Sequence, residues 1–121
     1  MSEINLSEAD LSESNLRGTN LSNANLMGTN LKRSMLDHAN LRGANLKGAN
    51  LNSAFMDAAN LTESNLTNAI LGNAAMCGTD LTNAILLDAE GFNTSSAYTE
   101  AHFCNTILPS GRLCNDSDFP D

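Results

Sequence analysis

The sequence contains few aromatic residues and almost no proline. With four Phe, one Tyr and no Trp among 121 residues, we expect no ligand pocket lined by aromatic rings. No proline occurs before Pro109, so the earlier residues keep every backbone N–H that a β-ladder needs. No apolar run approaches the roughly 18 residues of a membrane span, and no charged-then-apolar leader opens the sequence. These absences favour a cytoplasmic protein without membrane association; the thylakoid lumen or periplasm stays open if Met1 was added to a mature form.

Basic residues are also scarce. Six Lys and Arg oppose fourteen Asp and Glu, which gives a net charge of −8. Because phosphate contacts need a clustered basic surface, this balance disfavours nucleic-acid and anionic-membrane partners. Five of the six basic residues lie between Arg17 and Lys47, after an acidic start. The folded chain is therefore expected to have an acidic N-terminal end, a mixed band and an acidic C-terminal half.

One residue type is present with strict regularity. Leu or Met occupies every fifth position from Leu6 to Leu86, seventeen times in all, and Met56 and Met76 are the two methionines. On an α-helix, five steps of about 100° leave successive leucines about 140° apart, and on a flat strand they point to opposite faces. Neither element gathers these side chains on one face. The chain must therefore turn once in every five residues.

The positions around each leucine agree with such a turn. Two residues earlier, sixteen of seventeen residues are Ala, Ser or Thr, which suit a narrow interior shared with leucine. Just before the leucine, twelve of seventeen are Asn or Asp, as expected of an outward polar site. The corner position is rich in Gly and Asn, the types that best tolerate φ > 0 in turns. These corner residues are Gly18, Gly28, Gly43, Gly48, Gly78, Asn23, Asn68, Asn73 and Asn83.

A short unit that cannot bury its own apolar face must stack on copies of itself. The run of Ala-Asn-Leu-X-X and Ala-Asp-Leu-X-X units over residues 4–88 resembles the pentapeptide repeat family. The resemblance implies an all-β fold, a right-handed quadrilateral β-helix in which four pentapeptides form each coil. At about 4.8 Å per coil, the repeats and the tail give about five coils and a body about 25 Å long. Residues 103–111 resemble a terminal element common in cyanobacterial members of the family.

The chain is expected to form a single domain. Its length suits one unit, residues 1–121, in which residues 4–88 are the repeats. Residues 89–121 are predicted to form irregular repeats and a C-terminal cap, because a stacked β-helix exposes unpaired strand edges at its ends. Only residues 1–3 precede the repeats, so the N-terminal end is expected to be weakly capped.

The spacing of five returns in the tail. Its predicted centres are Tyr98, Phe103 and Leu108, which are offset by two positions from the main run of leucines. Two extra residues must therefore lie in the segment 89–95. We expect them to form a bulged loop around Gly91.

Stacking brings residues twenty apart into columns on the surface. One column of normally polar outward sites contains Asn15, Met35, Phe55 and Ala75, and is the only one with consecutive apolar residues there. Met35, Phe55 and Ala75 are therefore the candidate interaction patch. The alternatives are that Phe55 rotates inward or that neighbouring chains cover it.

A second column on the same side contains Arg17, Asp37, Asp57 and Cys77. It predicts an ion pair between Arg17 and Asp37, which contributes little if exposed. It also places Asp37 and Asp57 as like charges about 5 Å apart. Solvated carboxylates explain such a pair more simply than a bound cation does.

The cysteines and the sparse catalytic groups complete the candidate sites. Cys104 and Cys114 flank the Pro109-Ser110-Gly111 turn and could form a disulfide, which a reducing cytoplasm would keep open. The sequence has no recognisable nucleophile–base–orienter set, phosphate-binding glycine loop or metal-ligand spacing. We therefore predict no catalytic, cofactor-binding or metal-binding residues, and no enzyme activity.

The favoured function is a non-enzymatic structural or protein-interaction module with an unknown protein partner. The chain is expected to be a monomer, or a dimer through its weakly capped N-terminal end. The resemblance raises one alternative, since some long acidic pentapeptide proteins resemble duplex DNA, bind DNA gyrase and give quinolone resistance. A body of about 25 Å matches only about seven base pairs, which makes this alternative less suitable.

Overall fold

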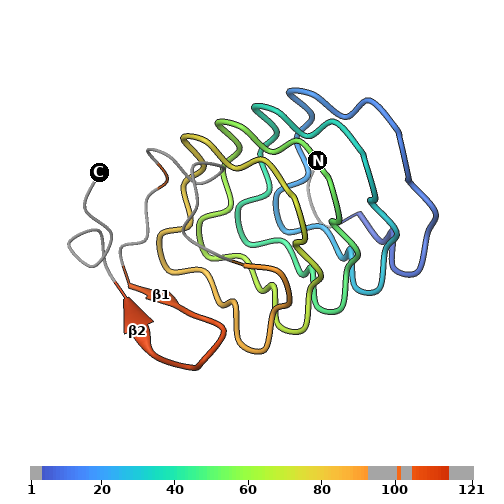
Figure 1. Cartoon of the computed structure of the whole chain (residues 1–121). Helices are drawn as coiled ribbons and strands as arrows, with labels where there is room; N and C mark the ends of the chain where they lie inside the picture. The colour runs from blue at the N-terminus through green and yellow to red at the C-terminus, as the bar shows by residue number, and fades with distance from the viewer. Residues whose placement is uncertain (1–3, 93–100, 102–104, 115–121) are drawn as a thin grey trace.

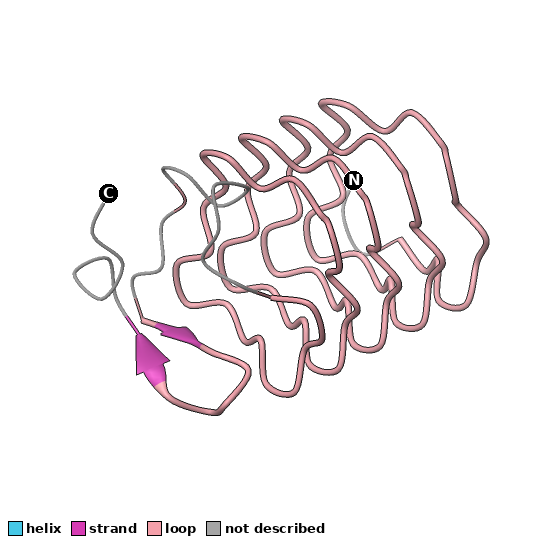
Figure 2. Ribbon diagram, viewed as in Figure 1, coloured by secondary structure: helices cyan, strands magenta, loops and turns pink. Residues whose placement is uncertain are grey.

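The computed structural model describes residues 4–92, 101 and 105–114 (Figure 1). The chain is a right-handed quadrilateral β-helix, as predicted, and its coils stack from the blue N-terminal end toward the orange C-terminal end. Parallel bridges join residues twenty apart, for example Asn5 with Asn25 and Asn25 with Asn45. One coil therefore contains four pentapeptides. Each side is short, so the coils are drawn as loops in Figure 2 and only two short strands are drawn as arrows.

The interior is a column of stacked leucines. From Leu21 to Leu86 every residue at the fifth position is at most 3% exposed, and Ala, Ser or Thr residues fill the space between them. In the first coil Leu6, Leu11 and Leu16 are only partly buried, because no described residue lies over them. The core thus depends on a coil on each side of every leucine.

Each leucine also begins a tight turn. The N–H three residues later donates to the leucine carbonyl at all seventeen positions, as in Ala44 N to Leu41 O at 3.0 Å. The residue two after the leucine has a positive φ in every repeat, as the third residue of a type II turn requires. The predicted Gly and Asn corners are confirmed. Eight further corners hold residues that rarely adopt this conformation: Glu8, Glu13, Arg33, His38, Ser53, Ala58, Glu63 and Asp88.

Backbone hydrogen bonds join neighbouring coils in a repeating pattern. Leu26 N donates to Asn45 O at 2.7 Å, Gly28 N donates to Lys47 O at 2.9 Å, and Asn45 N returns a bond to Ala24 O at 2.9 Å. The outward Asn or Asp position uses both its N–H and its C=O toward the preceding coil. This ladder bonds most backbone groups of every internal coil to the neighbouring coils and keeps the leucines in line.

The repeat changes at Gly91. Glu90 still pairs with Ile70, but Gly91 takes the place where a leucine would stack on Leu71. A Cβ on Gly91 would lie 2.6 Å from the backbone nitrogen of Gly72, so the two chain segments touch without any side chain between them. Phe92 is partly buried against the core and supplies the apolar group one residue late.

The predicted two extra residues are confirmed, but the segment 89–95 in which the bulged loop was predicted lies partly outside the described residues. Ile107 pairs with Ile85, which lies twenty-two residues earlier rather than twenty, and Leu108 is 6% exposed in the core. The other two predicted centres, Tyr98 and Phe103, lie outside the described residues. The leucine column therefore continues to Leu108.

A small hairpin follows the last described coil. Strand β1 (Thr106–Ile107) pairs with β2 (Leu113–Cys114) in the antiparallel sense, and Leu108 N donates to Arg112 O at 2.9 Å in the connecting turn. Cys114 is opposite Thr106 in this hairpin, and Cys104 lies outside the described residues. The disulfide between the two cysteines stays a prediction.

Replacing Gly91 with Ala should destabilise the fold strongly. The new Cβ meets the backbone of Gly72, and φ at Gly91 is +80°. We expect a loss of at least about 3 kcal/mol in the free energy of unfolding. Gly48→Ala is the matched control, because φ is +68° there but nothing lies within 4 Å; it should cost about 1 kcal/mol. Urea unfolding followed by circular dichroism measures both, and equal losses would contradict the close approach of the two segments.

Replacing Ser34 with Ala should leave the stability unchanged or raise it by up to about 1 kcal/mol, because a buried hydroxyl without a partner is removed. Ser34 is fully buried, and its hydroxyl has no hydrogen-bond partner in the described part of the chain. Ser64 is also buried, but its hydroxyl donates to Leu61 O at 2.7 Å, so Ser64→Ala should lose about 1 kcal/mol. The difference between the two urea midpoints tests this expectation, which a greater loss at Ser34 would refute.

Candidate interaction surface

The outward Asn and Asp residues do more than face solvent. At all twelve of these sites the side-chain Oδ1 accepts a hydrogen bond from the N–H two residues later, at 3.0–3.2 Å. This is an Asx turn, which holds the chain as it enters the corner. Reasoning from the sequence missed this role. The signal was present, because Asn or Asp ahead of a turn is typical of such a cap.

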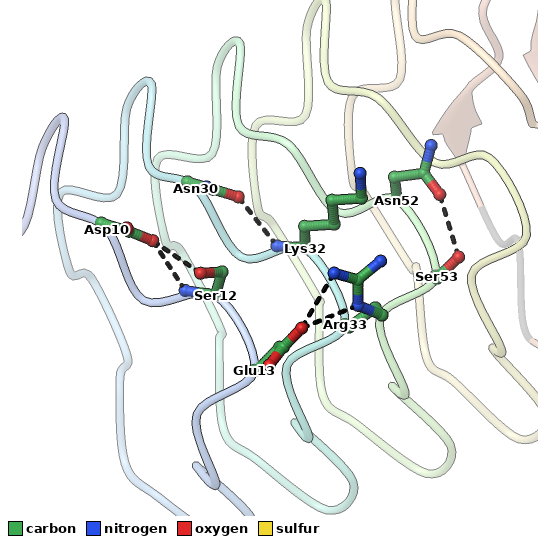
Figure 3. A network of polar contacts seen from close by, with 8 residues as sticks. All are labelled: Asp10, Ser12, Glu13, Asn30, Lys32, Arg33, Asn52 and Ser53. Atoms are coloured by element: carbon green, nitrogen blue, oxygen red, sulfur yellow. Dashed lines mark hydrogen bonds and ion pairs between the residues drawn. The ribbon is translucent and has the colours of Figure 1, made fainter.

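A Ser or Thr after the leucine strengthens several caps. The Ser12 hydroxyl donates to Asp10 Oδ1 at 2.8 Å, beside the backbone bond from Ser12 N at 3.1 Å (Figure 3). The Ser12 hydroxyl bond and then its N–H bond lower the pKa of Asp10. Asn30 caps the N–H of Lys32 in the next coil in the same way. Polar side chains on these faces are thus used in the fold itself.

Five outward sites lack this cap. They are Met35, Phe55, Ile70, Ala75 and Ile85. Three of them stack directly, because Phe55 forms bridges with Met35 on one side and Ala75 on the other. Phe55 is 47% exposed, so it does not rotate inward. We call Met35, Phe55 and Ala75 the Phe55 face; its binding of a partner stays a prediction.

The column beside the Phe55 face carries charge. Arg17 Nε and Asp37 Oδ2 form the predicted ion pair at 3.1 Å, with the Arg17 side chain 58% exposed, so the pair contributes little to stability. Asp57 accepts a hydrogen bond from Cys77 N at 2.9 Å, which replaces the cap that Ala75 cannot provide. Within the described residues, no three His, Cys, Asp or Glu side chains gather as a metal site would require.

Three of the five basic residues in the mixed charge band form ion pairs between coils. Arg33 Nη2 lies 2.8 Å from Glu13 Oε2 on the other side of the Phe55 face (Figure 3), and Arg42 Nη2 lies 3.2 Å from Glu63 Oε2. The sequence analysis named neither pair. Because these arginines are matched with carboxylates, they do not form a basic patch.

The chain belongs to the pentapeptide repeat family. The family described as "Pentapeptide repeats" matches residues 4–43, 24–62, 39–74 and 59–90, in eight copies. The crystal structure of a pentapeptide repeat protein, Rfr23 from the cyanobacterium Cyanothece 51142, is 26% identical, covers 94% of this chain and 90% of its own, and has a TM-score of 0.83. No curated protein matches the sequence.

Two other solved structures are similar at a lower level. A pentapeptide repeat protein from the Arabidopsis thaliana thylakoid lumen is 21% identical over 93% of this chain and 73% of its own, with a TM-score of 0.46. The full-length fluoroquinolone resistance protein QnrB1 is 20% identical over 97% of this chain and 64% of its own, with a TM-score of 0.38. In the described part of the chain, no helix has the length and apolar character to cross a membrane.

Replacing Phe55 with Asn should stabilise the protein. The Asp57 N–H has no hydrogen-bond partner among the described residues, and an Asn at position 55 would cap it as the other Asn residues do. We expect a gain of about 1 kcal/mol in the free energy of unfolding. Asn45→Ala is the converse variant, because it removes an existing cap and should lose about 1 kcal/mol. Thermal unfolding measures both changes, and a loss at Phe55→Asn would contradict the capping role.

Proposed function

We propose that this protein is a non-enzymatic structural or protein-interaction module, and that a protein partner contacts the Phe55 face. The observation that carries the proposal is the exposure of Phe55, 47%, at a site where twelve of seventeen repeats place a capping Asn or Asp. Met35 and Phe55 give up two turn caps in one column, and the cap that Ala75 lacks is replaced by Asp57. A site that departs from the repeat pattern without a gain in the stability of the fold is typical of a functional site.

The surroundings of Phe55 suit a protein partner. An exposed aromatic side chain is a common anchor in protein interfaces, since it buries a large apolar area on binding. The ion pairs Glu13–Arg33 and Arg17–Asp37 flank the face near Met35. An apolar centre with charged groups at its border resembles the usual arrangement of a protein-binding patch.

The family supports a role without catalysis. Pentapeptide repeat proteins are structural or interaction modules and typically not enzymes. In this chain the outward Asn and Asp side chains hold the turns, and three arginines are engaged in ion pairs. These side chains are occupied in the fold and are poorly available for chemistry.

Gyrase binding by DNA mimicry is less well supported. The net charge of −8 is compatible with it. The arginines between coils interrupt the acidic surface, and a body of about 25 Å matches only about seven base pairs. The likeness to QnrB1 is too low to bear on this question.

Affinity capture from extracts of the source cell tests the proposal. The wild-type chain should enrich at least one protein that Phe55→Asn loses by tenfold or more, because the anchor is gone while the fold is stabilised. Met27→Asn is the matched control, since Met27 is also apolar and 38% exposed but lies on another side of the coil. It should keep the same protein.

The captured protein must then bind the purified chain directly, with the same order of affinities among the three variants. Identical binding by wild type and Phe55→Asn would reject the Phe55 face. Catalytic turnover by the purified protein that is lost on mutating one polar residue would reject the non-enzymatic role.

A further inference from the structure

The first coil presents an open backbone edge. Four outward residues, one on each side of the coil, have neither N–H nor C=O bonded to any described residue: Asn5, Asp10, Asn15 and Asn20. Four more carbonyls of this coil also lack a partner among the described residues: Ser7, Ser12, Arg17 and Ser22. In every internal coil the equivalent groups bond to the coil before. Such an edge is a template for pairing with another chain.

We propose that the occupant of this edge is a second copy of the same chain, joined head to head. A two-fold axis perpendicular to the coil axis makes the facing sides of the two first coils antiparallel. In an antiparallel ladder, a residue that points both N–H and C=O at its neighbour exchanges two hydrogen bonds with it. Each first coil provides four such residues, so the edge is complementary to itself.

Among the described residues, the C-terminal end has no free parallel edge on the side of the coil that carries Ile85. There the ladder continues from Ile85 to Ile107 and then ends in β2, which is antiparallel to β1. Head-to-tail stacking would need a parallel edge to continue the ladder. The geometry of the described ends therefore favours two copies that meet at their first coils.

The interior of the first coil is not covered by any described residue either. Ile4 is 40% exposed, and Leu6 and Leu11 are partly buried, whereas Leu26 and Leu31, which stack on these two leucines, are fully buried. A second copy would close the leucine column by placing its own first coil against it. Burial of apolar side chains would then add to the hydrogen bonds at the rim.

The charges at the first coil determine whether added salt strengthens or weakens the dimer. Glu8 and Asp10 are exposed at this end and have no ion-pair partner among the described residues, so two copies bring like charges together. Added salt screens this repulsion and should strengthen the dimer. A side of five residues spans about 16 Å, so two ends bury less than the roughly 1,200 Å² of a standard interface. The dissociation constant should therefore lie in the micromolar range.

Sedimentation equilibrium of the full chain tests the dimer over a series of concentrations and salt. We expect a monomer–dimer equilibrium whose dissociation constant falls as salt is added. Ile4→Asp should weaken it tenfold or more, because it places a charge over the open interior and adds to the repulsion between the two ends. Met27→Asp, at a side chain of similar exposure on the wall of the coil, should leave it unchanged.

Amide hydrogen exchange gives a second measure that does not depend on the variant folding identically. The N–H groups of Asp10, Asn15 and Asn20 should become protected as wild-type concentration rises, and stay unprotected in Ile4→Asp. A strict monomer up to about 0.5 mM, well above a micromolar dissociation constant, would overturn the proposal. So would a dimer in which Ile4→Asp and Met27→Asp behave alike, or a dimer that salt dissociates. None of these outcomes depends on the Phe55 face.

Discussion

The fold depends on a turn with positive φ that must recur at every fifth residue. Each turn closes with a hydrogen bond to the leucine carbonyl, and four turns complete a coil of twenty residues. Only then do the leucines stack and the backbone of one coil meet the next in register. Eight corners adopt this conformation without Gly or Asn, at a cost of about 1 kcal/mol each. Stacking between coils must outweigh this strain.

Much of the fold could be predicted, because the strict period of five assigns each sequence position to the interior, the outward face or the corner of a coil. Leu6 to Leu86 defined the interior, and the offset at Leu108 correctly indicated two extra residues. The substitution of Phe92 for a leucine was not predicted. It depends on how closely Gly91 approaches Gly72, a backbone contact that no residue pattern specifies.

The surface was predicted less completely. The repeat of twenty residues per coil predicted the Arg17–Asp37 pair, because the two residues are twenty apart in the sequence. Arg42 and Glu63 are twenty-one apart, and long side chains reach such diagonal neighbours, so the simple register does not identify them. Hydrogen bonds from Asn side chains to the backbone were missed for another reason. Polarity at an outward site is explained equally well by solvation, and only the geometry separates the two roles.

The side walls and the ends of the β-helix differ in what can determine the choice of a binding partner. On the sides, the backbone ladder between internal coils does not depend on the outward side chains, so an outward residue such as Phe55 can change without disturbing the leucine column. The cost is one turn cap, about 1 kcal/mol. At the first coil the unpaired groups belong to the backbone and persist whatever residues stand there. Side-chain identity on the walls can therefore select a partner, while the proposed pairing at the end would need only another chain with the same backbone geometry.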